Sequence, residues 1–159
     1  MTSDVPKFLV DEMLQRLGRW LRAAGYDTVI ATNAAPDYYL LRQAIDEDRL
    51  LLTCDRELMQ HRRAPEHVIL LRGTTLEECV QELSRQLHLD WQYDPFSRCL
   101  VCNSLLLSAT PEQQEQAPDS VTERELPALY CPTCQQVFWE GSHVKRMRHQ
   151  LDTWQQNLG

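Results

Sequence analysis

The sequence predicts an α/β fold in which a parallel sheet flanked by helices is followed by a zinc-ribbon module. Two observations lead to this expectation. Short apolar runs alternate with segments of helical spacing over the first part of the chain, and two Cys-x-x-Cys pairs follow in the second part. A chain of 159 residues with 43% hydrophobic residues suits a domain with a small appendage. We therefore expect two domains, residues 1–90 and residues 91–159.

Four short apolar runs predict the strands of the sheet. They lie at residues 7–10, 27–31, 50–53 and 67–71. Helices are expected between these strands and after the last one, at residues 12–24, 36–47, 56–62 and 74–87. Because strands and helices alternate along the chain, the strands should run parallel, with the helices covering the sheet.

Local signals mark the ends of the predicted helices. Gly25 is a natural stop for the first helix, whose leucines recur at helical spacing. Pro36 suits the first position of the second helix, with Asp37 in its first turn. Thr74 or Thr75 caps the last helix of this part, where acidic residues in the first turn favour the helix dipole.

The second part of the chain has a different character. Residues 90–97 form an aromatic linker, and residues 98–140 hold the cysteine pairs among prolines, which indicates short strands and loops. The Gln/Glu-rich stretch at 112–125 is expected to be a solvated loop or a short helix. Residues 143–157 are expected to form a terminal helix.

The two cysteine pairs predict a structural zinc site. Each pair places two thiolates on one tight turn, and two such turns supply the four tetrahedral ligands that zinc prefers. The long stretch between the pairs, residues 103–130, indicates a ribbon rather than a compact finger. Two disulfides or four free thiols are the alternatives, and disulfides need an oxidising compartment. The predicted ligands are Cys99, Cys102, Cys131 and Cys134.

Three aspartates fall where a parallel sheet places its functional sites, beyond the carboxyl ends of the strands. Asp11 follows the first strand, Asp37 opens the helix after the second strand, and Asp55 follows the third. Carboxylates that meet at one place repel each other unless a cation neutralises them, and Mg²⁺ or Mn²⁺ prefers such oxygen ligands. The alternative is that each aspartate only caps or decorates a helix.

The net charge of −7 argues against nucleic acid as a partner when taken alone, but the charge is unevenly distributed. Basic residues collect in a stripe on the first helix and in a cluster on the terminal helix. These residues are the candidates for phosphate contacts, above all Arg19, Arg22, Lys145, Arg146 and Arg148. Aromatic residues such as Trp91, Tyr93 and Trp139 could stack on an unpaired base or simply pack.

Several common functions are excluded by missing motifs. The chain has no Gly-rich phosphate loop, no Gly-x-Ser-x-Gly elbow and no His-Glu-x-x-His motif. No apolar run approaches the length of a membrane span, and no signal peptide is recognisable. We therefore expect a cytoplasmic protein without a membrane partner. The oligomeric state is not predicted.

Beyond these patterns, the chain resembles the Mut-seven C-terminal RNase domain family, a PIN-like group. Residues 8–27 (FLVDEMLQRLGRWLRAAGYD) resemble the opening signature of this family, and residues 51–58 (LLTCDREL) resemble its second block. Residues 98–103, 130–134 and 138–143 resemble its zinc ribbon and the segment that follows. The resemblance implies a PIN-like fold, acidic metal ligands and RNA cleavage. Asp11 and Asp55 match the acidic motif positions, and Asp37 falls in a stretch that is usually more acidic.

These observations lead to a main hypothesis and two alternatives. The main hypothesis is a hydrolase, a metal-dependent endoribonuclease with Asp11, Asp37 and Asp55 holding one or two Mg²⁺ or Mn²⁺ ions and a structural zinc in the ribbon. In-line attack by water would leave 5′-phosphate and 3′-hydroxyl ends. The first alternative is an adaptor that binds RNA or ribonucleoprotein without catalysis. The second is a protein–protein module with a structural zinc.

Overall fold

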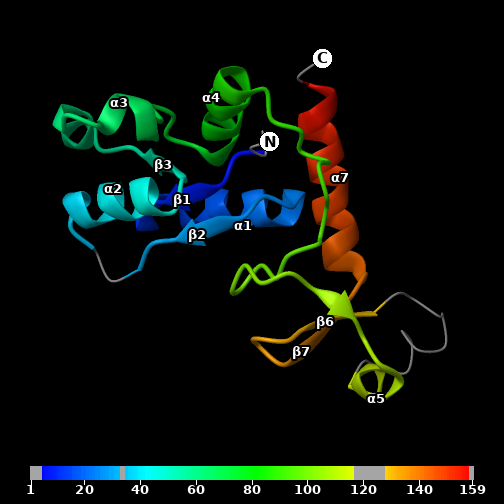
Figure 1. The fold of residues 1–159 in the computed structure, drawn as a ribbon. Helices are drawn as coiled ribbons and strands as arrows, with labels where there is room; N and C mark the ends of the chain where they lie inside the picture. Colours follow the sequence, from blue (N-terminus) through cyan, green and yellow to red (C-terminus); the bar gives the residue numbers. More distant parts are fainter. Residues whose placement is uncertain (1–4, 33–34, 117–127, 158–159) are drawn as a thin grey trace.

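A four-stranded parallel sheet forms the centre of the molecule in the computed structural model, which describes residues 5–32, 35–116 and 128–157 (Figure 1). The strand order is β2-β1-β3-β4, and every neighbouring pair is parallel. The bounds are Phe8–Val10 for β1, Thr28–Ile30 for β2, Leu50–Thr53 for β3 and Val68–Leu70 for β4. The α/β architecture predicted from the sequence is therefore confirmed.

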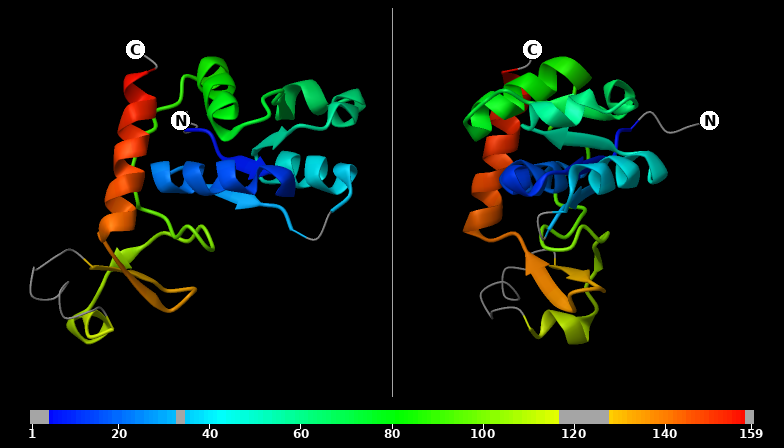
Figure 2. Two further views of the ribbon diagram at one scale, coloured as in Figure 1. Left: turned by 180° about the vertical axis from the view of Figure 1, so that it is seen from behind. Right: turned by 90° about the vertical axis from the view of Figure 1, so that its left-hand side faces the viewer.

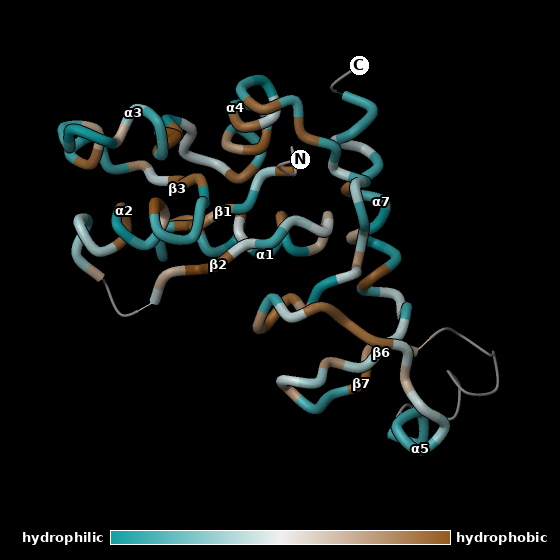
Figure 3. Tube along the Cα trace, in the orientation of Figure 1, coloured by the Kyte–Doolittle hydropathy of each residue, from teal (hydrophilic) through white to brown (hydrophobic). Residues whose placement is uncertain are grey.

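Alternate residues of the central strands supply two separate cores. Phe8 and Val10 of β1 point to one face of the sheet, where they join α1 (Gln15–Ala24) and α4 (Leu76–Leu87) in a large apolar cluster. Leu9 points to the other face, toward α2 (Asp37–Asp46) and α3 (Ala64–His67). Both faces are covered because strand side chains alternate, as a parallel sheet requires. Figure 3 shows the hydrophobic residues along these strands.

The helices of this part differ from the prediction mainly at their ends. The expected helix at 12–24 begins as a 3-10 turn, η1 (Glu12–Leu14), before α1. The expected helix at 56–62 is a 3-10 turn, η2 (Arg56–Gln60), and the short α3 follows it. Thr75, rather than Thr74, caps α4 by accepting a hydrogen bond from the backbone N–H of Glu78 at 3.2 Å.

Gly25 ends α1 in a left-handed conformation, with φ of 104°. A Cβ atom at this position would lie 2.4 Å from the backbone oxygen of Asp94. The close approach exists because the linker after α4 crosses the end of α1, where the N–H of Asp94 donates to the carbonyl of Ala24 at 2.9 Å. Only glycine combines this dihedral angle with this contact.

The second part of the chain forms an antiparallel sheet in the order β5-β6-β7. The bounds are Leu107–Ser108 for β5, Ala128–Cys131 for β6 and Gln136–Trp139 for β7. The predicted loop or helix at 112–125 lies partly in the short helix α5 (Pro111–Gln114), and residues 117–125 lie outside the described residues. These strands are compatible with the expected zinc-ribbon module.

The terminal helix α7 (Ser142–Gln156) returns from the ribbon to the main sheet, as the two views in Figure 2 show. Met147, Leu151 and Trp154 of α7 belong to the same apolar cluster as α1 and α4. The Trp154 ring meets the rings of Trp20 and Trp91 edge to face, at centroid distances of 4.8 and 5.1 Å. α7 is therefore packed on the main sheet as well as joined to the ribbon. The predicted division of the chain into two domains at residue 90 stays a prediction.

Candidate functional site

The first candidate site lies at the carboxyl edge of the parallel sheet. Asp11 follows β1 and caps η1, with its Oδ1 accepting from the backbone N–H of Met13 at 3.3 Å. Asp55 follows β3 and caps η2, with its Oδ1 accepting from the N–H of Glu57 at 2.9 Å. The capping roles that the sequence left open therefore exist. Each cap uses Oδ1 of its aspartate. The contacts of the second carboxylate oxygen, Oδ2, therefore decide whether a site can form.

Thr53, the last residue of β3, connects these two aspartates. Its hydroxyl donates to Oδ2 of Asp11 at 3.2 Å and accepts from the backbone N–H of Asp55 at 3.0 Å. The residue has no exposed surface, so this hydroxyl is held in one position by the sheet. Thr53 thus fixes the Asp11 carboxylate against the backbone of Asp55, although the two residues are far apart in sequence.

Asp37 completes the acidic group from the first turn of α2. Its pKa is raised, first by partial burial and then by the neighbouring carboxyl groups of Asp55 and Asp11, while His61 opposes the shift. An influence of this kind requires the three carboxyl groups to lie near one another. The parallel sheet therefore brings all three predicted aspartates to one region.

The three aspartates are less closely grouped than the four cysteines of the ribbon, which form a second candidate site described below. Within the part of the chain that the structure describes, only the four cysteines bring three or more potential metal ligands into one tight group. The donor set of the acidic group is nevertheless chemically suited to Mg²⁺ or Mn²⁺, because these ions prefer carboxylate oxygens and keep several waters.

A cleft of about 570 Å³ is lined by Cys54 and Arg56, the two residues that flank Asp55, and by Met13, which follows Asp11 closely. The ends of β3 and β4 and the starts of α1 and α4 line it, and it contains the exposed side chains of Arg16, Arg56 and Arg72. Cys54 also lines this cleft, and its pKa is raised, first by burial and then by the charge of Asp11. The raised pKa keeps this thiol protonated at neutral pH, so it is not an activated nucleophile.

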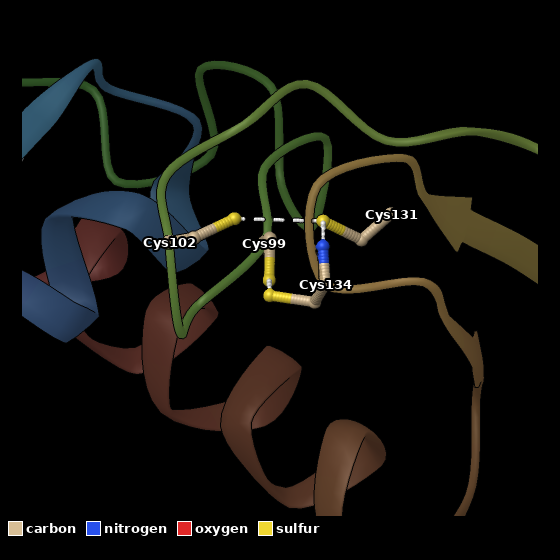
Figure 4. Close-up of side chains that lie close together, drawn as sticks. All are labelled: Cys99, Cys102, Cys131 and Cys134. Atoms are coloured by element: carbon tan, nitrogen blue, oxygen red, sulfur yellow. Dashed lines mark hydrogen bonds between the residues drawn. The ribbon is translucent and has the colours of Figure 1, made fainter.

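The second candidate site is formed by the four predicted cysteines, which two turns of the ribbon present to one another (Figure 4). The Sγ atoms of Cys99 and Cys134 are 3.9 Å apart, and those of Cys102 and Cys131 are 3.5 Å apart. All four Sγ atoms lie within 4.8 Å of one another. A tetrahedral zinc ion with Zn–S bonds of about 2.3 Å would hold its ligands about 3.8 Å apart. The cluster therefore fits a structural metal such as zinc.

The thiols of this cluster interact strongly. Hydrogen bonds from Ser104 and from neighbouring cysteines outweigh the effect of burial and lower the pKa of Cys102 to about 6. The hydrogen bond to Cys102 raises the pKa of Cys134 to about 12. One thiol ionises at the expense of its neighbour because adjacent thiolates repel each other, and a bound cation relieves this repulsion.

The predicted RNA-contact residues divide into two kinds. The side chains of Arg19, Lys145, Arg146 and Arg148 are exposed on α1 and α7. Arg148 is also engaged within the protein, because it pairs with Glu140 and its guanidinium carbon lies 4.9 Å from the centroid of the Phe96 ring.

Arg22 differs from these residues because its side chain is only 6% exposed. Its Nε donates to the carbonyl of Thr28 at 2.8 Å, and its NH1 donates to the carbonyls of Leu100 and Val101 at 3.0 and 3.1 Å. Arg22 therefore joins α1 to β2 and to the first cysteine turn. Because its donors bind these carbonyls in the interior, Arg22 is not part of the proposed RNA surface.

The aromatic residues that the sequence left open have structural partners. Trp91 is fully buried, and its Nε1–H donates to the hydroxyl of Ser84 at 2.8 Å. Tyr93 stacks on Tyr26 at a centroid distance of 5.1 Å. Trp139 is half-buried in β7.

Sequence reasoning missed three contributors to the first site, Thr53, Arg56 and Arg72. A threonine that ends an otherwise apolar strand two residues before an aspartate was a usable signal for Thr53. The arginines gave weaker signals, since each merely follows a strand end.

None of the helices in the described ranges is long and apolar enough to cross a membrane.

Comparison with known proteins agrees with this architecture. The family model of the Mut7-C RNAse domain matches residues 6–151, which span both the parallel sheet and the cysteine cluster. Searches of curated proteins and of solved structures found no match. The matched region contains the three aspartates, the four cysteines and α7 as far as Leu151. On the strength of a match over almost its whole length, the chain belongs to the Mut7-C RNAse domain family.

Proposed function

We propose that this protein is a metal-dependent endoribonuclease whose reaction takes place at the carboxyl edge of the parallel sheet. The observation that carries the proposal is the link between Asp11 and Asp55 through the Thr53 hydroxyl, with Asp37 near enough for both carboxyl groups to raise its pKa. Membership of a family described as an RNAse domain supports RNA as the substrate. The RNA-related role follows from the family, while the metal dependence and the catalytic residues are our proposal.

In this proposal the three aspartates hold Mg²⁺ or Mn²⁺ through their carboxylate oxygens. The cap of Asp55 does not use Oδ2, and Oδ2 of Asp11 keeps a lone pair beside the hydrogen bond from Thr53. When bound, such an ion activates the attacking water and neutralises charge that develops on the phosphate. Thr53 positions the Asp11 carboxylate, and the Asp55 cap holds its own side chain on η2. The arginines of the cleft and Arg19 attract and orient the phosphodiester backbone.

The cysteine cluster has a structural task in this proposal. A zinc ion held by Cys99, Cys102, Cys131 and Cys134 would lock the two turns of the ribbon together. Because Arg22 binds the carbonyls of the first turn, the ribbon would then be held against α1. Exposed Lys145, Arg146 and Arg148 on α7 extend the basic surface beyond the ribbon.

The decisive experiment is the substitution Asp11→Asn. Asparagine still caps a helix about as well as aspartate, so the fold should persist. If Asp11 is a metal ligand, the substitution should abolish Mn²⁺-dependent RNA cleavage and leave RNA binding intact. If Asp11 is only a cap, activity should remain close to that of the wild type.

Glu57→Gln provides the matched control, because it also removes one carboxylate charge near the site, from an exposed side chain. We expect this control to cleave RNA normally. A wild-type protein that cleaves no RNA with either Mg²⁺ or Mn²⁺ would contradict the proposal. RNA binding that persists in that case would favour the second candidate function, an RNA-binding adaptor, which is compatible with the looseness of the acidic group.

A further inference from the structure

Two consecutive tyrosines at the start of α2 form an exposed aromatic surface. Tyr38 and Tyr39 follow Asp37 directly, and their side chains are 57% and 56% exposed. Their rings stack on each other at a centroid distance of 4.4 Å and an interplanar angle of 30°. Two large rings kept together in water differ from the scattered exposed apolar residues that any protein shows, and such surfaces often mark a binding site.

Tyr38 also lines a groove of about 400 Å³ between α2 and the segment that follows η2. The opposite wall of this groove carries His61, Arg62 and Arg63, all of which are exposed. Arg42 lies on the tyrosine side and pairs weakly with Asp46, at 3.8 Å between Nε and Oδ2. Three arginines face one aspartate here, so the groove is locally positive although the chain as a whole carries a charge of −7.

The groove leads to the acidic group. Asp37 lies at the helix end beside Tyr38, and His61 on the opposite wall is close enough to influence the electrostatics of Asp37. Because Tyr38 lines the groove and Asp37 precedes it at the start of α2, a chain lying in the groove would pass close to Asp37. The arginine cleft on the far side of β3 would receive its continuation.

We propose that the tyrosine pair and this groove bind a segment of single-stranded RNA next to the bond to be cleaved, with unpaired bases on Tyr38 and Tyr39 and backbone phosphates on Arg62 and Arg63. The inference rests on the proposed nuclease function and adds the class of substrate that the site accepts. Aromatic rings stack on any base, and arginines bind phosphates irrespective of sequence. Bases in a duplex are already stacked and unavailable, so the surface selects unpaired RNA. The excess of arginines that line the groove favours a polyanion such as RNA as the ligand.

The test measures binding rather than cleavage, on full-length protein carrying Asp11→Asn so that the RNA stays intact. The probes are a fluorescently labelled 12-nucleotide oligouridylate, an abasic oligonucleotide of the same length and a 12-base-pair RNA duplex, compared by fluorescence anisotropy. We expect the oligouridylate to bind more tightly than either of the other probes.

Replacing both Tyr38 and Tyr39 with alanine should weaken oligouridylate binding by at least about tenfold, since one stacked base contributes about 1–3 kcal/mol. The same change should leave binding of the abasic probe unaltered, because that probe offers phosphates only. Phenylalanine at both positions should retain most of the affinity. Tyr93→Ala is the matched control, since it removes another exposed tyrosine that lies after α4 and does not line the groove, and it should have no effect.

Replacing Arg62 and Arg63 with alanine should weaken binding of both single-stranded probes and reduce the salt dependence, by about 0.7 in the log–log slope for each phosphate contact that is lost. If the alanine-substituted tyrosine variant binds oligouridylate as tightly as its parent while the wild type still cleaves RNA, the inference is wrong and the proposed function stands. The tyrosine surface would then fit a protein partner instead. A parent that binds none of the probes overturns the inference, and a wild type that also cleaves no RNA overturns the proposed function.

Discussion

Arg22→Met removes a buried cation whose hydrogen bonds join three parts of the chain. Methionine keeps a long unbranched apolar side chain, so the space on α1 stays filled. It cannot donate to the carbonyls of Thr28, Leu100 and Val101, so one buried acceptor and two partly buried acceptors lose this donor. The variant therefore isolates the hydrogen bonds from the packing.

The magnitude follows from the number of bonds and from the burial. Hydrogen bonds to a charged group contribute about 1.5–3 kcal/mol each, so the three together represent about 4–9 kcal/mol. Burying the guanidinium opposes this by several kcal/mol, and this burial also lowers the pKa of Arg22. We expect a net loss of about 3 kcal/mol in the free energy of unfolding, or about 6–12 °C in Tm for a chain of this size.

Two measurements check this expectation. Urea denaturation followed by tryptophan fluorescence reports the stability of the apolar cluster that contains Trp91 and Trp154. Zinc release to a chelating dye reports on the ribbon, and it should become faster because Arg22 no longer holds the first cysteine turn. Arg19→Met is the matched control on the same helix. Its side chain is exposed, so its stability should stay within about 0.5 kcal/mol of the wild type.

The opposite pattern would refute this reasoning. If Arg22→Met were as stable as the wild type and lost only its affinity for RNA, then Arg22 would be a phosphate contact and its buried hydrogen bonds would be incidental. Arg19→Met should show that pattern, because Arg19 is exposed and belongs to the proposed RNA surface.

Three further predictions concern the zinc site, the acidic edge and the pH dependence of folding. Cys102→Ser should lower the zinc content from one ion per chain and loosen the ribbon, while circular dichroism still shows the parallel-sheet domain. Thr53→Val should cost about 1–2 kcal/mol of stability and reduce Mn²⁺-dependent cleavage, and Thr53→Ser should restore both, because only the hydroxyl reaches Asp11. Burial alone would raise the pKa of Asp27, but hydrogen bonds from Arg49 and Asn103 hold this pKa below its ordinary value of 3.8. The contribution of Asp27 to stability is therefore present above pH 3.8 and is lost as the pH falls through the lower pKa of the folded state. Asp27→Asn should therefore be less stable than the wild type near pH 6, and denaturation curves should converge in acid.

Much of the fold follows from short stretches of sequence. The four strands and the helices between them were predictable because apolar runs and helical spacing are local patterns. The cysteine cluster was predictable because each pair lies on one turn, which leaves only the meeting of two turns to the tertiary structure. The aspartates were predictable as a group because strand ends of a parallel sheet share one edge.

Only the tertiary structure decided the roles of residues that depend on neighbours distant in sequence. Arg19 and Arg22 are three residues apart on one helix, and sequence spacing treated them alike. Arg22 is buried because the first cysteine turn and β2 cover it, whereas nothing covers Arg19 in the same way. Thr53 acts on Asp11 only because β1 and β3 are neighbours in the sheet.

The aromatic residues show the same division between sequence and structure. The sequence by itself determined which residues are aromatic and on which elements they lie. The tertiary structure decided that Trp91 fills the core beneath α7 while Tyr38 and Tyr39 stay exposed beside the acidic edge. The physical reason is that burial depends on which elements pack over a side chain, and for these residues those elements come from distant parts of the chain.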